Sequence, residues 1–238
     1  FAAAPIELRA RADIVRRTVR FTLSHPLLSA AGDIDAADQP TGSVTLTIPS
    51  LAPYAAVAGL DLQGHATATT KFAQQDGATT IGVDGTVGIT GGLPVVAGLL
   101  GDNATIALTG ALRGGDLALG DLAVNGKALR VSAKGAETAG VVALDWQAAL
   151  SDLSVVAARA AGTLSARGHV GGPRQDLSAT AQLTGDAAVA GLPRESFTAA
   201  LSAQGLPAAP SGKIEADGRF AGAPLRLAAA VSRQNDGT

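Results

Sequence analysis

Hydrophobic and polar residues alternate along most of the chain. Between residues 80 and 90, Ile81 and Val83 occupy alternate positions, whereas the flanking residues Thr80 and Asp84 fall on the opposite face of an extended chain. Successive side chains of a strand point to opposite faces of a sheet, so a period of two predicts a strand with one apolar face. The same alternation recurs at 105–109, 129–132, 142–147, 177–183, 214–216 and 225–231.

Turn signals separate these alternating segments. Asp76-Gly77, Gly114-Gly115-Asp116 and Asn125-Gly126 are typical of hairpins. Glycine also recurs so often between Gly82 and Gly140 that no long helix is expected there, because each glycine costs a helix about 1 kcal/mol relative to alanine. The pattern predicts an all-β chain folded as a meander of antiparallel strands.

Three stretches interrupt the alternation and predict short helices. They are Pro49 to Ala58, Leu93 to Leu100, and Ser151 to Ala161. Ser50 precedes the first, and Ser151 and Asp152 open the third, as N-cap residues do.

The N-terminal part, Ile6 to Thr22, is predicted to form strands. Arg16, Arg17 and Arg20 lie close together there. We expect these three arginines to be solvated.

Internal similarity suggests a repeat protein. The segment from Gly59 to His65 is echoed by the segment from Gly162 to His169, and a third related segment runs from Gly212 to Phe220. Spaced similarity of this kind is typical of architectures in which each unit stacks on its neighbours. We expect an internal fragment of a larger repeat protein, with modules at about 1–58, 59–160, 161–210 and 211–238.

The composition restricts the partners that the chain can have. The net charge is −2 with thinly spread basic residues, which gives no basic patch for a nucleic acid. There is no cysteine, which excludes disulfides and thiolate metal sites. Hydrophobic residues make up 47% of the chain and charged residues 16%, so much apolar surface has to be covered by something.

Candidate chemistry is sparse. The three histidines, His25, His65 and His169, have no carboxylate or cysteine partners at ligand spacing. No nucleophile elbow is found, and no pair of acids is brought together by the sequence pattern. We expect no catalytic residue, no metal and no cofactor, and therefore a protein that is not an enzyme.

Degenerate strands joined by two related connecting segments, Pro49 to Gly64 and Leu150 to Gly162, carry a family resemblance. Together with the segments 117–129 and 210–225, they resemble the middle of TamB, the inner-membrane subunit of the translocation and assembly module, an AsmA-like family. The resemblance covers nearly the whole chain as a diffuse pattern rather than a sharp motif.

The resemblance implies a long, strongly curved antiparallel sheet, a β-taco or repeating β-groove with a few short helices. It further implies a place in the periplasm of a Gram-negative bacterium, as part of a protein anchored in the inner membrane. The groove would conduct phospholipids between inner and outer membranes and support outer-membrane biogenesis, protein secretion and protein assembly. The partners implied are phospholipid acyl chains and a BamA-type outer-membrane protein, whose contact would lie outside this fragment.

The residue pattern is compatible with the same mechanism, because strands with one aliphatic face make a trough and small residues let a sheet curve. The candidates for the lining of that groove are Ile81, Val83, Val87, Ile89, Ile106, Leu108, Leu129, Val131, Val142 and Leu144. Two alternatives remain open. These residues could instead fill the dry core of a closed sandwich, and the chain could be a structural or adhesive β-solenoid of the autotransporter-passenger type without a lipid groove.

Overall fold

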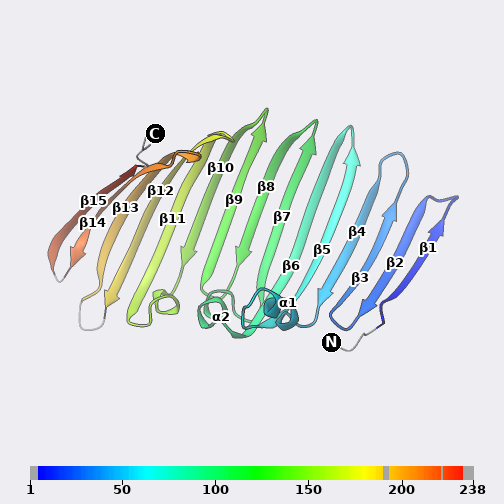
Figure 1. The fold of residues 1–238 in the computed structure, drawn as a ribbon, viewed down its shortest axis with the longest axis horizontal. Helices are drawn as coiled ribbons and strands as arrows, with labels where there is room; N and C mark the ends of the chain where they lie inside the picture. Colours follow the sequence, from blue (N-terminus) through cyan, green and yellow to red (C-terminus); the bar gives the residue numbers. More distant parts are fainter. Residues whose placement is uncertain (1–4, 190–192, 221, 233–238) are drawn as a thin grey trace, which may run out of the picture. The chain divides into compact units, whose positions relative to one another are not determined.

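A computed structural model describes residues 5–189, 193–220 and 222–232, and it is an all-β protein. Fifteen strands follow one another in the sheet in chain order, each antiparallel to its hydrogen-bonded neighbours (Figure 1). Among the described residues, the first and last strands each have a ladder on one side only, so the sheet is not closed. The chain forms two compact units, residues 1–127 and 128–238. The alternation of the sequence therefore predicted the all-β, antiparallel class correctly.

The first unit contains eight strands connected mainly by hairpins. They are β1 (Glu7–Asp13), β2 (Thr18–His25), β3 (Leu28–Asp35), β4 (Thr41–Ile48), β5 (Leu62–Gln75), β6 (Ala78–Gly92), β7 (Ala104–Arg113) and β8 (Asp116–Asn125). The predicted turns Asp76-Gly77 and Gly114-Gly115 lie at hairpin tips, where Asp76 and all three glycines have positive φ angles. Glycine adopts this conformation at no steric cost, which explains its place at these tips.

The second unit contains seven strands in the same up-and-down arrangement. They are β9 (Leu129–Thr138), β10 (Val141–Leu150), β11 (Ala160–Pro173), β12 (Asp176–Val189), β13 (Glu195–Pro207), β14 (Ser211–Phe220) and β15 (Ala223–Ser232). Within this unit, each strand pairs antiparallel with the strands that precede and follow it in the unit.

Two of the three predicted helices form, and the third is much shorter than expected. The helices are α1 (Ala52–Val57), α2 (Pro94–Leu100) and the single 3-10 turn η1 (Leu153–Val155). The helix expected from 151 to 161 is reduced to this three-residue turn, and the last two positions of the range belong to β11, which begins at Ala160. Asp152 is the N-cap of η1 and accepts a hydrogen bond from the Ser154 amide at 2.9 Å, as expected. Leu51, not Ser50, is the N-cap of α1.

In the first unit, α1 and α2 lie at the same end of the strands (Figure 1). The helix α2 packs against β6, and there Ile89 is only 4% exposed and Ala104 only 1%. The amide of Ile89 donates a hydrogen bond to the carbonyl oxygen of Gly101 at 2.7 Å, which ties the end of α2 to the strand. The helix α1 packs against β5 through the buried Ala55. The few buried apolar side chains described in this unit lie at these contacts.

Large aromatic side chains lie across the strands from glycines. A Cβ atom added to such a glycine would come within 2.5 to 2.9 Å of the ring of its partner. The glycine thus provides the space that the flat ring occupies, and the ring covers backbone that would otherwise face solvent. The pairs are Phe21 with Gly32, Phe72 with Gly42, Trp146 with Gly168, and Phe197 with Gly185. Aromatic residues are few in this chain, and this placement gives four of them a glycine partner.

Of the helices in the described part of the chain, none has the length and hydropathy that a membrane crossing requires.

Candidate functional site

The strand ladders of the first unit place aliphatic residues of consecutive strands on one face. Val83 of β6 lies directly opposite Leu108 of β7, which lies opposite Leu122 of β8. The row continues from Val83 to Thr70 of β5 and Val44 of β4. Directly opposite residues of an antiparallel pair lie on the same face of the sheet, so this row is continuous across five strands. We call this surface the aliphatic face of the first unit.

All six candidate residues of the first unit belong to this aliphatic face. Val83 and Leu108 are a direct pair, whereas Ile81 lies opposite Gly110 and Ile106 opposite Gly85. Val87 and Ile89 continue the same face along β6, where Val87 lies opposite Ala104. Sequence reasoning missed the members on other strands, which are Val19, Phe21, Leu23, Ile34, Val44, Leu46, Ile48, Phe72, Leu122 and Val124.

A β-bulge explains why the sequence pattern did not reveal the aliphatic residues of β8. Its register shifts so that Thr109 pairs with Asp121 while Gly110 pairs with Leu119. The extra residue, Gly120, changes the alternation from odd to even positions. Leu119 and Leu122 therefore lie on the same face although they are three positions apart in the sequence.

The second unit has an aliphatic face of its own, and the four remaining candidates lie on it. Leu129 and Val131 of β9 lie opposite Leu150 and Ala148 of β10, on the face that also carries Val142 and Leu144. Further members that the sequence analysis did not select are Trp146, Leu164, Val170, Leu183, Phe197, Leu201, Ile214, Leu225, Leu227 and Val231. The signal for Trp146 was present, because it continues the alternation of Val142 and Leu144.

The aliphatic face of the second unit contains a hollow of about 430 Å³. Trp146 borders it, together with Leu201 of β13 and Ile214 of β14, which lie directly opposite each other. The small residues Ala181, Ala203 and Gly212 lie between the larger ones and make the depression. The hollow is apolar, and its size is in the range of ligand pockets.

The two aliphatic faces are largely uncovered by the chain itself. The chain exposes 15412 Å², whereas a compact protein of its 23.4 kDa exposes about 9,700 Å². The buried apolar side chains among the described residues are Ala55, Ile89, Ala104 and Ala128, and three of these are alanines. Larger residues of the faces remain open to solvent, for example Ile81, which is 42% exposed, and Leu227, which is 54% exposed.

The opposite face of each unit is polar. In the first unit threonines cross the ladder, and the hydroxyls of Thr45 and Thr69 are 3.0 Å apart. In the second unit Nδ1 of His169 lies 2.8 Å from a carboxylate oxygen of Asp145. His65 also lies on a polar face, opposite Gly88. The structure thus separates polar from aliphatic side chains as the alternation predicted.

Charged residues at the strand ends form local contacts. The Asp186 carboxylate accepts a hydrogen bond from the Thr163 hydroxyl at 2.7 Å, which holds the pKa of Asp186 below its ordinary value, and Arg194 lies 3.1 Å away. Glu137 forms an ion pair with Arg174, and their hydrogen bond raises the pKa of the Arg174 guanidinium.

In the described ranges, no group of three or more His, Cys, Asp or Glu residues is arranged to hold a metal ion.

Comparison with known proteins found no matching family model, no matching curated protein and no matching solved structure. The two aliphatic faces and their surroundings are therefore the basis for a proposed function.

Proposed function

We propose that the chain is a periplasmic segment of a TamB-like protein whose sheet forms a hydrophobic β-groove for phospholipid acyl chains. In this proposal the sheet curves around the acyl chains, and the full protein conducts phospholipids between the inner and outer membranes and supports outer-membrane protein assembly. The aliphatic faces are the conducting surface, and no catalytic residue is required.

The observation that carries the proposal is the continuity of each aliphatic face. In the first unit, the row that contains Val83 and Leu108 runs from β4 to β8 with no charged residue, and Thr70 of β5 is its one polar member. In the second unit, a row runs from Leu144 through Val170, Ala179 and Ala203 to Val231. Neither row is buried in a core, so both are available to an apolar ligand.

Energetics favour a lipid as that ligand. Transferring an acyl chain from water onto an apolar surface contributes about 0.8 kcal/mol for each buried methylene group. This gain needs no polar contact at a fixed position, so a chain can slide along a row of aliphatic side chains. Small residues such as Ala181 and Ala203 would let acyl chains approach the backbone closely.

The test is photo-crosslinking of lipids in cells that produce the full-length protein. A photoreactive amino acid replaces Ile106 on the aliphatic face, and in a matched variant it replaces the neighbouring Thr105 on the opposite face. The corresponding pair in the second unit is Leu144 and Ala143. We expect phospholipid adducts at 106 and 144 and none at 105 and 143.

Equal labelling on both faces would indicate non-specific contact with membranes and would refute the proposal. Absence of adducts at 106 and 144, repeated at Val83, would mean that the aliphatic faces are covered by protein. In that case a closed core would replace the lipid groove.

The membership of a translocation and assembly module, the inner-membrane anchor and the BamA-type partner belong to the same proposal. They can be tested by co-purification of the full-length protein with an outer-membrane partner. The β-solenoid alternative is less favoured by the topology, because each strand pairs antiparallel with its sequence neighbours, whereas β-helical repeats stack parallel strands.

A further inference from the structure

Charged residues that lie directly opposite each other in the ladders have opposite signs, with one exception among the described registers. The complementary pairs are Arg20 with Asp33, Arg113 with Asp116, Lys134 with Asp145, and Asp217 with Arg226. The exception is Arg11 of β1, which lies directly opposite Arg20 of β2. Like charges at such positions destabilise a sheet. The stability of the sheet therefore does not explain why two arginines lie opposite each other here.

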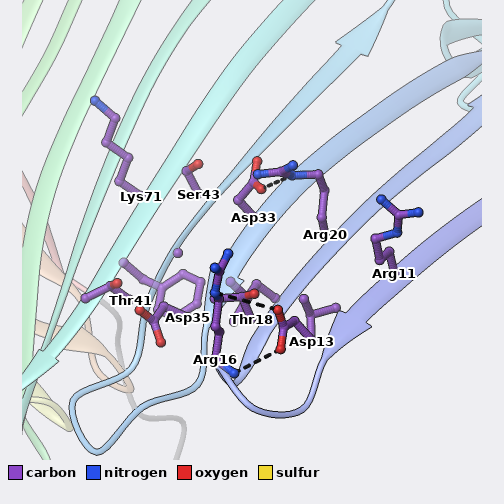
Figure 2. A pocket seen from close by; sticks show the side chains of 14 residues that line it. Arg11, Asp13, Arg16, Thr18, Arg20, Asp33, Asp35, Thr41, Ser43 and Lys71 are labelled. Carbon is purple, nitrogen blue, oxygen red and sulfur yellow. Dashed lines mark hydrogen bonds and ion pairs between the residues drawn. The ribbon is translucent and has the colours of Figure 1, made fainter.

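Arg11 and Arg20 border a hollow of about 730 Å³ on the polar face of the first unit (Figure 2). Arg16 extends into the same region from the turn between β1 and β2. Thr18 and Ser43 add hydroxyl groups to the lining, and Lys71 of β5 lies on its far side. The hollow thus combines cationic groups with hydroxyl donors.

The carboxylates of the hollow leave much of this donor capacity free. The Asp33 carboxylate accepts a hydrogen bond from Nε of Arg20. The two terminal nitrogens of that guanidinium have no acceptor among the described residues. Asp13 accepts hydrogen bonds from the amides of Val15 and Arg16, and its carboxylate also lies 3.9 Å from Nε of Arg16, which leaves the two terminal nitrogens of Arg16 for a further ligand. Arg11 has no ion-pair or hydrogen-bond partner within the described part of the chain.

We propose that this hollow binds a phosphate-type oxyanion between the guanidinium groups of Arg11 and Arg20, with Arg16 as a third ligand. The planar guanidinium matches the geometry of phosphate oxygens, and two of them can share one anion. The bound charge would relieve the repulsion between Arg11 and Arg20. Free phosphate and the phosphate of a lipid headgroup share this chemistry. The site lies on the face opposite the aliphatic face, so it does not depend on the proposed lipid groove.

The first experiment measures thermal unfolding of the full-length chain with inorganic phosphate and with chloride at equal ionic strength. We expect phosphate to raise the Tm of the unmodified protein more than chloride does. The Arg11→Gln, Arg20→Gln double variant should lose the phosphate-specific shift. The matched control is Arg130→Gln, Arg159→Gln, which removes the same charge from exposed positions of the second unit and should keep the shift.

A second variant tests the site by gain of binding. Asp33→Asn removes the carboxylate that competes for Arg20, so phosphate should raise the Tm of this variant at lower concentration than it does for the unmodified protein. An equal shift with phosphate and chloride, or a phosphate shift that survives the loss of both Arg11 and Arg20, would overturn the proposal.

Vesicles identify the source of the anion. Sedimentation with phosphatidylcholine vesicles, with and without phosphatidylglycerol, compares a neutral with an anionic surface. Binding to the anionic vesicles that requires Arg11 and Arg20 would support a lipid headgroup as the ligand. A phosphate-specific Tm shift without such sedimentation would support a free phosphate compound.

Discussion

The indole ring of Trp146 lies over Gly168, its direct partner across the β10–β11 ladder, so that a Cβ atom at position 168 would approach the ring to 2.7 Å. The same Cβ would also meet the backbone of Thr180. Neither neighbour can move freely, because one is a flat ring packed on the sheet and the other is part of a ladder. The aromatic residue and the glycine therefore depend on each other.

We predict that Gly168→Ala destabilises the protein by about 1–3 kcal/mol, the usual cost of overpacking. The measurement is equilibrium unfolding in urea. Gly82→Ala is the matched control, because a Cβ there meets nothing within 4 Å. That control should be neutral or slightly stabilising, since alanine restricts the unfolded chain. Equal losses in both variants would argue against the packing explanation.

The two isoleucines at the ends of β6 should differ in their contribution to stability. Ile89 is 4% exposed beneath α2, whereas Ile81 is 42% exposed on the same face. Ile89→Ala should therefore lower the free energy of unfolding by about 2–5 kcal/mol, and Ile81→Ala by about 1 kcal/mol or less. Urea denaturation of both variants gives the comparison. A large loss for Ile81→Ala would mean that this part of the aliphatic face is covered.

Trp146 provides an optical probe of the apolar hollow, because it is the single tryptophan of the chain. We predict that phospholipids with brominated acyl chains quench its fluorescence, since a chain that lies in the hollow contacts the ring. Leu201→Asp places a charge at the border of the hollow and should weaken the quenching.

The matched control for that experiment is Gln204→Asp, because the side chain of Gln204 alternates to the opposite face of β13 and does not line the hollow. It should leave the quenching unchanged. If Gln204→Asp weakened quenching as much as Leu201→Asp does, the effect would come from charge rather than from the hollow.

The pH dependence of stability should have a contribution from Asp186. Its hydrogen bond with Thr163 lowers the pKa of the carboxyl in the folded protein, so the ionised form favours folding. This contribution is complete above the ordinary aspartate pKa of about 3.9, and it is lost as the pH falls through the lower folded value. Thr163→Val should move the pKa of Asp186 up toward its ordinary value, as measured by NMR titration.

Ser165→Ala is the control for this titration, because the Ser165 hydroxyl contacts Thr184 at 2.8 Å rather than Asp186. An unchanged titration of Asp186 in Thr163→Val would show that the hydroxyl is not responsible for the shift.

Local pattern predicted the strands well and the irregular elements less well. Ile81, Val83, Ile106 and Leu108 were assigned correctly to one face because the alternation of each strand is unbroken. Leu122 was missed because the bulge at Gly120 changes its register, which depends on the pairing with β7. The helix expected from 151 to 161 is reduced to the turn at Leu153–Val155, and the last two positions of that range pair as the start of β11.

The sequence by itself determined the all-β class and the two-faced strands, because alternation and glycine content act within a few neighbouring residues. Only the tertiary structure decided the register in which neighbouring strands pair. Those registers gather aliphatic residues from distant segments into one face, set Trp146 over Gly168, and place Arg11 opposite Arg20. Such pairings depend on long-range hydrogen bonds between backbones, which no local pattern of side chains encodes.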